Sequence, residues 1–318
     1  AKGQKMSKSR GNTVNPWELL GKHGADSIRW YFYTINQPWD DKLFKEKDIE
    51  DAKKGFINIL FNSFAYFKTY AGKKFKITGS VKNPKLIINK WLMIKFNVLV
   101  KEAGAALDNY DIVLAARKIH EFVVEDISHW YIRRIRDIMK NEKSAEAKET
   151  KVIFGKILND LSILIAPFTP FIAEEIYLGV SPKKESAHLE DYPVFVKTLA
   201  GKPEQKLIKE MDWVRSVVSM ALEERIKLGI KVRQPLALLK VKSQISNLKF
   251  NKELLGLIKG EVNIKEIVFD KDLENEIWID AEITPALKEE GVLRDITRAI
   301  QDLRKKSGLT PKDRPVLF

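Results

Sequence analysis

Apolar side chains recur at three- and four-residue spacing through most of the stretch from Lys45 to Tyr177, and this period limits the possible folds more than any other feature. One such stripe consists of Phe56, Ile59, Leu60, Ser63, Phe64 and Phe67. This spacing places the side chains on one face of an amphipathic α-helix. Gly72 follows the stripe, and a glycine there can end a helix in the left-handed conformation. The sequence therefore predicts a first long helix that ends at Gly72.

Further helices follow, separated by short loops. We expect Pro84 to open the next helix. Its buried face is expected to consist of Trp91, Ile94, Val98 and Ala105. Two more helices are expected over residues 112–140 and 145–166, and another begins at Pro170 with Thr169 as its N-cap. Because four or five long amphipathic helices joined in this way form an antiparallel bundle, the predicted fold class is mainly α.

In the last third of the chain, strand-like segments appear between helices. The expected elements are helices at 204–228, 248–259 and 286–306 and short strands at 238–242, 264–269 and 276–283. Together these elements make a small α+β domain. Just before the first strand, Lys231 and Arg233 alternate with apolar residues. This period of two predicts a strand that carries both cations on one side.

These patterns divide the chain into four parts. We assign residues 1–42 to a basic loop and connector, 43–180 to the helical bundle, 181–203 to a linker and 204–318 to a truncated α+β domain. In the connector, Asp26 is expected to cap a short helix over residues 27–34. The sequence opens without a methionine and stops in what reads as a strand, so we expect a piece of a longer protein.

Charge and cysteine content restrict the function classes. The formal net charge is +13, which favours a polyanionic partner, most commonly a nucleic acid, although a merely basic surface is the alternative. The chain has no cysteine, which excludes disulfides and cysteine nucleophiles and fits a cytoplasmic protein. No apolar run approaches the roughly 20 residues that span a bilayer. His188 stands apart from other metal-ligand residues, so we predict neither a membrane segment nor a metal site.

The expected helix at 112–140 carries a cluster of cations beside two aromatic residues. Arg133 and Arg136 are three residues apart and so share a helix face, with Arg134 between them. Trp130 and Tyr131 precede them directly. Arginines beside aromatic rings can hold unstacked RNA bases and phosphates. The alternative is a solvated basic face with Trp130 simply buried.

A second basic cluster lies at the start of the chain, where residues 5–12 hold three cations, two serines and a glycine. Lysine ammonium groups suit phosphate oxygens. Serine hydroxyls and backbone N–H groups exposed by glycine can bond the same anion. This composition is consistent with a polyphosphate-binding loop, or with an ordinary basic terminus.

The order of residues in this cluster adds a resemblance. Lys-Met-Ser-Lys-Ser at 5–9 resembles the second signature of class I aminoacyl-tRNA synthetases, and Arg-Gly-Asn at 10–12 resembles its isoleucyl, valyl and leucyl branch. Later segments are similar to the isoleucyl branch in particular: residues 15–18, 24–31, 38–40, 130–133, 166–177, 186–193 and 229–236. The resemblance thus extends over the connector, the bundle and the start of the last domain.

Membership of this branch implies a parent enzyme that activates isoleucine with ATP and transfers it to a tRNA. The resemblance implies that Lys5 and Lys8 are catalytic, and that they bind ATP together with Ser7 and Ser9. It also implies a tRNA-binding set made of Trp130, Tyr131, Arg133, Arg134, Arg136, Lys231 and Arg233. The expected partner is the anticodon region of tRNA(Ile), and the expected state is a monomer.

The first class I signature, His-x-Gly-His, is absent from the chain. We therefore expect the fragment to be inactive on its own, with ATP, Mg²⁺ and isoleucine bound only by the full-length enzyme and the loop at 5–9 mobile. Two alternatives stay open at this point. One is a valyl or leucyl enzyme of the same branch, and the other is a generic RNA-binding or assembly module.

Overall fold

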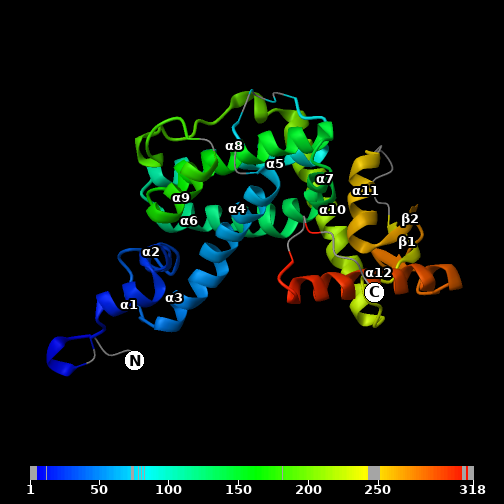
Figure 1. The fold of residues 1–318 in the computed structure, drawn as a ribbon, viewed down its shortest axis with the longest axis horizontal. Coiled ribbons are helices and arrows are strands. Elements are labelled where there is room, and N and C mark those ends of the chain that lie inside the picture. The colour runs from blue at the N-terminus through cyan, green and yellow to red at the C-terminus, as the bar shows by residue number, and fades with distance from the viewer. Residues whose placement is uncertain are drawn as a thin grey trace. The chain divides into compact units, whose positions relative to one another are not determined.

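The structure is a computed structural model that describes residues 6–11, 13–72, 75–77, 79, 81, 83–180, 182–242, 251–309 and 313. The chain divides into two compact units, Ala1–Ile208 and Lys209–Phe318 (Figure 1). The first is helical, and the second combines helices with a three-stranded sheet. The predicted fold class, mainly α with a small α+β part, is confirmed.

The first unit begins with short elements that lead into the bundle. They are η1 (Lys8–Arg10), α1 (Pro16–His23), α2 (Ala25–Thr34) and α3 (Glu46–Ala52). Asn15 caps α1, because its side-chain Oδ1 accepts a hydrogen bond from the Trp17 N–H at 3.0 Å. Leu19, Tyr31 and Ile49 form a small core that joins the three helices.

The bundle consists of long helices in the order that the sequence predicts (Figure 1). They are η2 (Lys53–Ile57), α4 (Asn58–Ala71), α5 (Ile87–Asp108), α6 (Ile112–Glu121), η3 (Phe122–Tyr131), α7 (Ile132–Lys140), α8 (Ala145–Ile165) and α9 (Pro170–Val180). The π-helices η2 and η3 continue their neighbours without a break, so α6, η3 and α7 form one rod over the predicted range 112–140. Helix α5 packs against α6 and α8, and α8 packs against α7 and α9.

The start of α5 differs from the prediction, because a carboxylate from another helix caps it. Pro84 does not open the helix, which begins three residues later at Ile87. Glu149 of α8 accepts hydrogen bonds from the N–H groups of Lys85 and Leu86 at 2.9 and 3.2 Å. Within α5, the predicted core residue Ala105 is exposed. The interhelical packing rather than the local pattern thus fixes this end of the helix.

Helix α9 has the same kind of tertiary cap. Asp26, which we expected to cap its own helix, lies inside the first turn of α2. Its carboxylate accepts hydrogen bonds from the N–H groups of Phe171 and Ile172 at 3.3 and 2.7 Å. The hydroxyl of Thr169, the predicted N-cap, is buried without a hydrogen-bond partner among the residues described. A carboxylate from α2 therefore caps α9 in place of the local threonine.

The connector after α9 contains two single 3₁₀ turns, η4 (Ala187–Leu189) and η5 (Lys197–Leu199). Helix α10 (Lys202–Lys227) follows and crosses the division between the two units.

The second unit is built on a sheet of order β2-β1-β3. Its elements are β1 (Leu236–Lys242), α11 (Lys252–Val262), β2 (Ile264–Asp270), β3 (Ile277–Ile279) and α12 (Pro285–Lys306). Strand β1 pairs in parallel with β2, and α11 provides the crossover that a parallel pair requires. Strand β3 pairs antiparallel with the other edge of β1. Leu236, Leu239, Leu254 and Ile258 are fully buried in this unit.

One predicted strand is wrong. The segment with Lys231 and Arg233 is a turn, and β1 begins only at Leu236. The two cations therefore do not share one side of a strand. The side chains of Arg225 and Asn263 instead donate hydrogen bonds to the backbone carbonyls of this turn.

Candidate nucleic-acid interface

The outer face of α7 carries two of the predicted tRNA-binding arginines. Arg133 and Arg136 are exposed, whereas Ile132, Ile135 and Met139 on the opposite side are buried. This alternation follows from the helical period, which separates positions 133 and 136 from the apolar positions. The arrangement places two guanidinium groups one turn apart on an accessible surface.

Trp130 and Tyr131 lie in the bundle core and not on this face. Tyr131 is fully buried, and its hydroxyl donates a hydrogen bond to Oδ1 of the buried Asn89 at 2.7 Å. Burial raises the pKa of the Tyr131 hydroxyl. Trp130 is 6% exposed. Neither ring offers a face on which a nucleic-acid base could stack, which corrects the expectation of an aromatic platform at these positions.

Arg134 is directed toward the core rather than outward. Its guanidinium lies 4.6 Å from the centre of the Trp130 ring, a cation–π arrangement. Burial, and secondarily the charge of Arg133, lowers the pKa of Arg134 to about 9. Of the three clustered arginines, the structure therefore presents Arg133 and Arg136 outward and packs Arg134 inside.

Two tyrosines that the sequence reasoning missed lie beside this surface. Tyr66 and Tyr70 of α4 are half-buried, with ring centres 4.9 Å apart. Burial is the main cause of a raised Tyr66 pKa, and the nearby charge of Arg136 opposes it. The spacing of four residues indicates that the two rings share a helix face. That this face meets α7 depends on bundle packing, which the sequence did not reveal.

Lys231 and Arg233, the second predicted pair of cations, differ in their exposure to solvent. Lys231 is exposed in the turn before β1, whereas Arg233 is half-buried and forms an ion pair with Asp295 of α12 at 2.5 Å. Only Lys231 of this pair is thus presented to solvent without an acidic partner among the described residues.

The predicted ATP-binding loop is only partly described. Lys5 and the side chain of Lys8 lie outside the described residues. The turn η1 brings the hydroxyls of Ser7 and Ser9 within 3.1 Å of each other. The N–H of Arg10 donates to the Ser7 carbonyl at 3.1 Å, and Gly11 takes a positive φ of 61°. Two of the four predicted ATP-binding residues therefore share one side of a tight turn.

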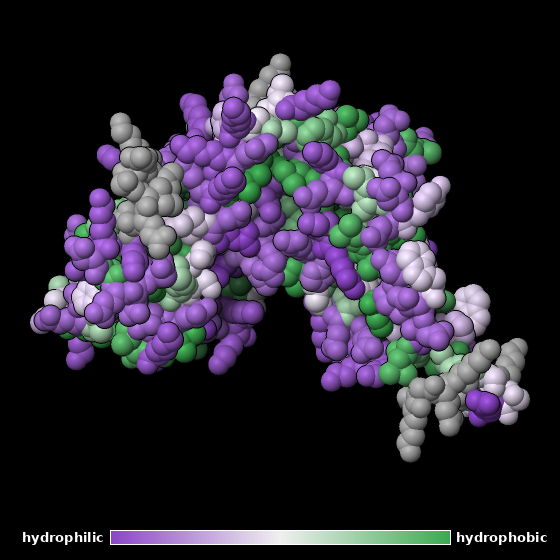
Figure 2. All heavy atoms as spheres, turned by 180° about the vertical axis from the view of Figure 1, so that it is seen from behind, coloured by the Kyte–Doolittle hydropathy of each residue, from purple (hydrophilic) through white to green (hydrophobic). Residues whose placement is uncertain are grey.

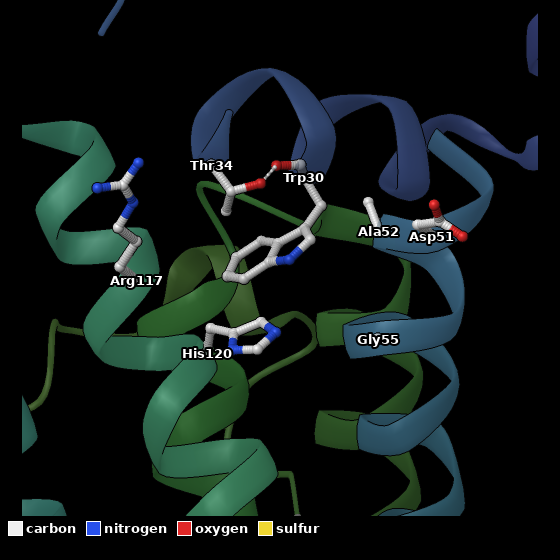
Figure 3. Close-up of a pocket in the computed structure, with 7 residues that line it drawn as sticks. All are labelled: Trp30, Thr34, Asp51, Ala52, Gly55, Arg117 and His120. Atoms are coloured by element: carbon white, nitrogen blue, oxygen red, sulfur yellow. Dashed lines mark hydrogen bonds between the residues drawn. The ribbon is translucent and has the colours of Figure 1, made fainter. Parts of the chain in front are cut away.

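A cavity of about 270 Å³ opens between α2, α3, η2 and α6 (Figure 3). It is lined by Trp30, Thr34, Asp51, Ala52, Gly55, Arg117 and His120. The rings of Trp30 and His120 each stack on Phe56, with centres 3.6 and 5.9 Å apart. Figure 3 shows the guanidinium of Arg117 directed away from the indole of Trp30. Because the aromatic walls already stack within the protein, we place the candidate interface on α7 and not here.

Hydrophilic residues predominate on the face that Figure 2 shows, with smaller hydrophobic patches between them. Across the residues described, no helix has both the length and the apolar character that a membrane crossing requires. Nor do three histidine or acidic side chains come together there as a metal site would need.

Two family models match the chain. The model for class I tRNA synthetases of the I, L, M and V type matches residues 1–43. The model for the anticodon-binding domain of tRNA ligases matches residues 89–242, which include both α7 and the turn with Lys231.

Curated relatives agree with these models. Isoleucine–tRNA ligase of Clostridium tetani is 35% identical over 96% of this chain, and that of Dehalococcoides mccartyi is 34% identical over 98%. The Thermus thermophilus enzyme is 35% identical over 84% of the chain. The chain spans 29%, 33% and 26% of these three relatives, respectively. The chain therefore belongs to the class I aminoacyl-tRNA synthetases, within which it corresponds to a C-terminal part of isoleucyl-tRNA ligase.

Proposed function

We propose that this chain binds the anticodon region of tRNA(Ile) through the exposed arginines of α7. The observation that carries the proposal is the outward placement of Arg133 and Arg136 within the residues that match an anticodon-binding domain. Arginine can contact phosphates bidentately and stack on bases. The half-buried pair Tyr66 and Tyr70 would supply the aromatic surface that Trp130 and Tyr131 do not.

The parent protein is proposed to attach isoleucine to its tRNA with ATP, accompanied by Mg²⁺. The close hydroxyls of Ser7 and Ser9 and the positive φ of Gly11 fit a turn that bonds phosphate oxygens. In the full-length enzyme, Ser7 and Ser9 would hold the ATP phosphates. The ammonium groups of Lys5 and Lys8 would stabilise the negative charge that develops on the leaving pyrophosphate. The chain alone has no His-x-Gly-His signature, so we propose that it lacks aminoacylation activity. Isoleucine-dependent ATP–pyrophosphate exchange by this chain would refute that statement.

Titration of tRNA(Ile) against the chain tests the binding proposal. Replacing Arg133 and Arg136 by alanine removes two cations, so the slope of log affinity against log salt should fall by about 2. The matched control replaces Lys45 and Lys47, two exposed lysines at the start of α3, and should leave the slope unchanged. Equal slopes for the wild-type chain and the arginine variant would remove α7 from the interface.

The monomeric state expected from the sequence stays a prediction, which sedimentation analysis would test. The valyl and leucyl alternatives lose their support, because the relatives described above are isoleucine–tRNA ligases. A generic RNA-binding module would bind bulk tRNA as tightly as tRNA(Ile). Competition between the two tRNAs distinguishes it from the proposed function.

A further inference from the structure

The turn between α10 and β1 is held from inside by a buried guanidinium. Arg225, near the end of α10, is fully buried. Its Nη2 donates to the carbonyl oxygens of Lys231 and Val232, each at 3.3 Å, and also to that of Gln234. Burial lowers the pKa of Arg225 to about 10, so the group stays charged at neutral pH. A full positive charge is therefore directed at the backbone of a surface turn.

Other side chains of the same unit complete this support. Asn263 has a positive φ of 57° and donates through Nδ2 to the carbonyls of Val232 and Arg233, each at 3.0 Å. Gln234 Nε2 donates to the carbonyl of Leu287 at 2.7 Å. Each backbone carbonyl from residue 231 to residue 234 therefore accepts a hydrogen bond from the side chain of Arg225, of Asn263 or of both. The conformation of the turn is set by the interior of the unit before any partner binds.

Helix α12 adds a steric limit and a further bond. Arg294 Nη1 donates to Oδ1 of Asn263 at 2.7 Å, which orients the Asn263 amide toward the turn. Gly291 faces Gln234 so closely that an added Cβ would lie 2.4 Å from the Gln234 Oε1. Glycine at this position thus allows Gln234 to reach α12.

Besides Arg225 and Arg294, the described cations at the turn are Lys227, Lys231 and Arg233, and these three differ in their partners. Lys227 pairs with Glu224 at 3.2 Å, and Arg233 pairs with Asp295. Lys231 is exposed and, among the described residues, has no acidic partner. Next to it Val232 is 44% exposed. The turn therefore presents the ammonium group of Lys231 to solvent, where it can bind an external anion.

We propose that Lys231 contacts a phosphate of the bound tRNA and that Arg225 is its positioning residue. The inference rests on the proposed function, because it assigns a further contact to the same partner. A turn that is ordered before binding loses little conformational entropy on association, so its cation contributes more of its interaction to affinity. The net charge of +13 and the match of residues 89–242 to an anticodon-binding domain favour RNA over an acidic protein.

The test is a salt-dependent titration of the complete 318-residue chain with an isoleucine tRNA transcript, between 50 and 200 mM KCl. For Lys231→Ala, the slope of log affinity against log salt should fall by about 1. The loss of affinity should then be about fourfold larger at the low than at the high salt concentration. Lys271→Ala, at an exposed lysine of the same unit, should leave the slope unchanged.

Arg225→Met should lower the slope by the same amount, although Arg225 itself is buried, and the double variant with Lys231→Ala should lose nothing more. If Arg225→Met does not fold, Asn263→Gly removes two of the turn's hydrogen bonds while glycine tolerates the positive φ. The same reduced slope is then expected.

Two results would overturn the inference. One is an unchanged slope for Lys231→Ala while the α7 arginine variant still weakens binding, which would leave the proposed function intact. The other is additive losses for the Arg225 and Lys231 variants, which would mean that Arg225 does not act through Lys231. Absence of tRNA binding by the wild-type chain would instead refute the proposed function itself.

Discussion

Helix α7 and the turn before β1 are both short basic segments within the residues that match the anticodon-binding model, but their cations are placed by different means. On α7, the helical period alone separates the exposed Arg133 and Arg136 from the buried Ile132 and Ile135. The turn has no helical period to orient its side chains, and the buried Arg225 and Asn263 fix its backbone by hydrogen bonds instead. A cation on a helix can thus be oriented by its neighbours in sequence, whereas a cation in a turn depends on side chains packed beneath it.

The largest effect is expected from removing the support beneath the turn. Arg225→Met removes the buried guanidinium that donates to three backbone carbonyls, and of these only that of Gln234 has no second donor among the described residues. The second unit should therefore lose about 3 kcal/mol of stability. Hydrogen exchange of the β1 and β2 amides measures this loss in that unit alone.

Arg134 provides the matched control for this comparison. Its guanidinium stacks on Trp130 in a helix that the bundle already defines, so Arg134→Met should cost only about 1 kcal/mol in the first unit. Equal losses for the two variants would contradict the distinction between helix and turn.

A smaller effect is expected at the cap of α9, where a tertiary carboxylate replaces a local cap. Asp26→Ala removes the acceptor for the Phe171 and Ile172 N–H groups and should destabilise the first unit by about 1 kcal/mol. Thr169→Val removes only a buried hydroxyl without a described partner, so it should be neutral or slightly stabilising. Thermal unfolding of both variants checks this order. A larger loss of stability for the threonine variant would mean that Thr169, and not Asp26, caps α9.

The smallest effect concerns pH. Burial lowers the pKa of His120 from its ordinary value of 6.5. Below pH 6.5 His120 is therefore protonated more readily in the unfolded than in the folded chain. The stability of the first unit should fall as the pH drops. His120→Gln should reduce this slope. A pH series of denaturant titrations in which both proteins show the same slope would exclude a contribution from His120.

The sequence predicted the bundle well because its information is local. The ranges 112–140 and 145–166 agree with α6 to α7 and with α8 within one residue, since apolar spacing and flanking polar loops set these limits. The start of α5 was misplaced because its cap, Glu149, lies more than 60 residues away in the sequence. The strand expected around Lys231 was wrong because alternation over four residues cannot reveal the buried Arg225 beneath a turn.

The candidate site was predictable to a similar degree. The helical period placed Arg133 and Arg136 on one helix face, but it could not show that η3 carries Trp130 and Tyr131 into the core. The tyrosine pair on α4 was missed because only packing brings it beside Arg136. Residue types and helix faces are thus readable in the sequence, whereas contacts between helices are not.

Nuclease footprinting of isoleucine tRNA tests the central claim most directly. If the exposed arginines of α7 bind the anticodon region, the wild-type chain should protect the anticodon loop from cleavage. The variant with Arg133 and Arg136 replaced by alanine should leave that loop as accessible as in free tRNA at the same protein concentration. Protection confined to the acceptor end, or anticodon protection that persists in the variant, would contradict the claim.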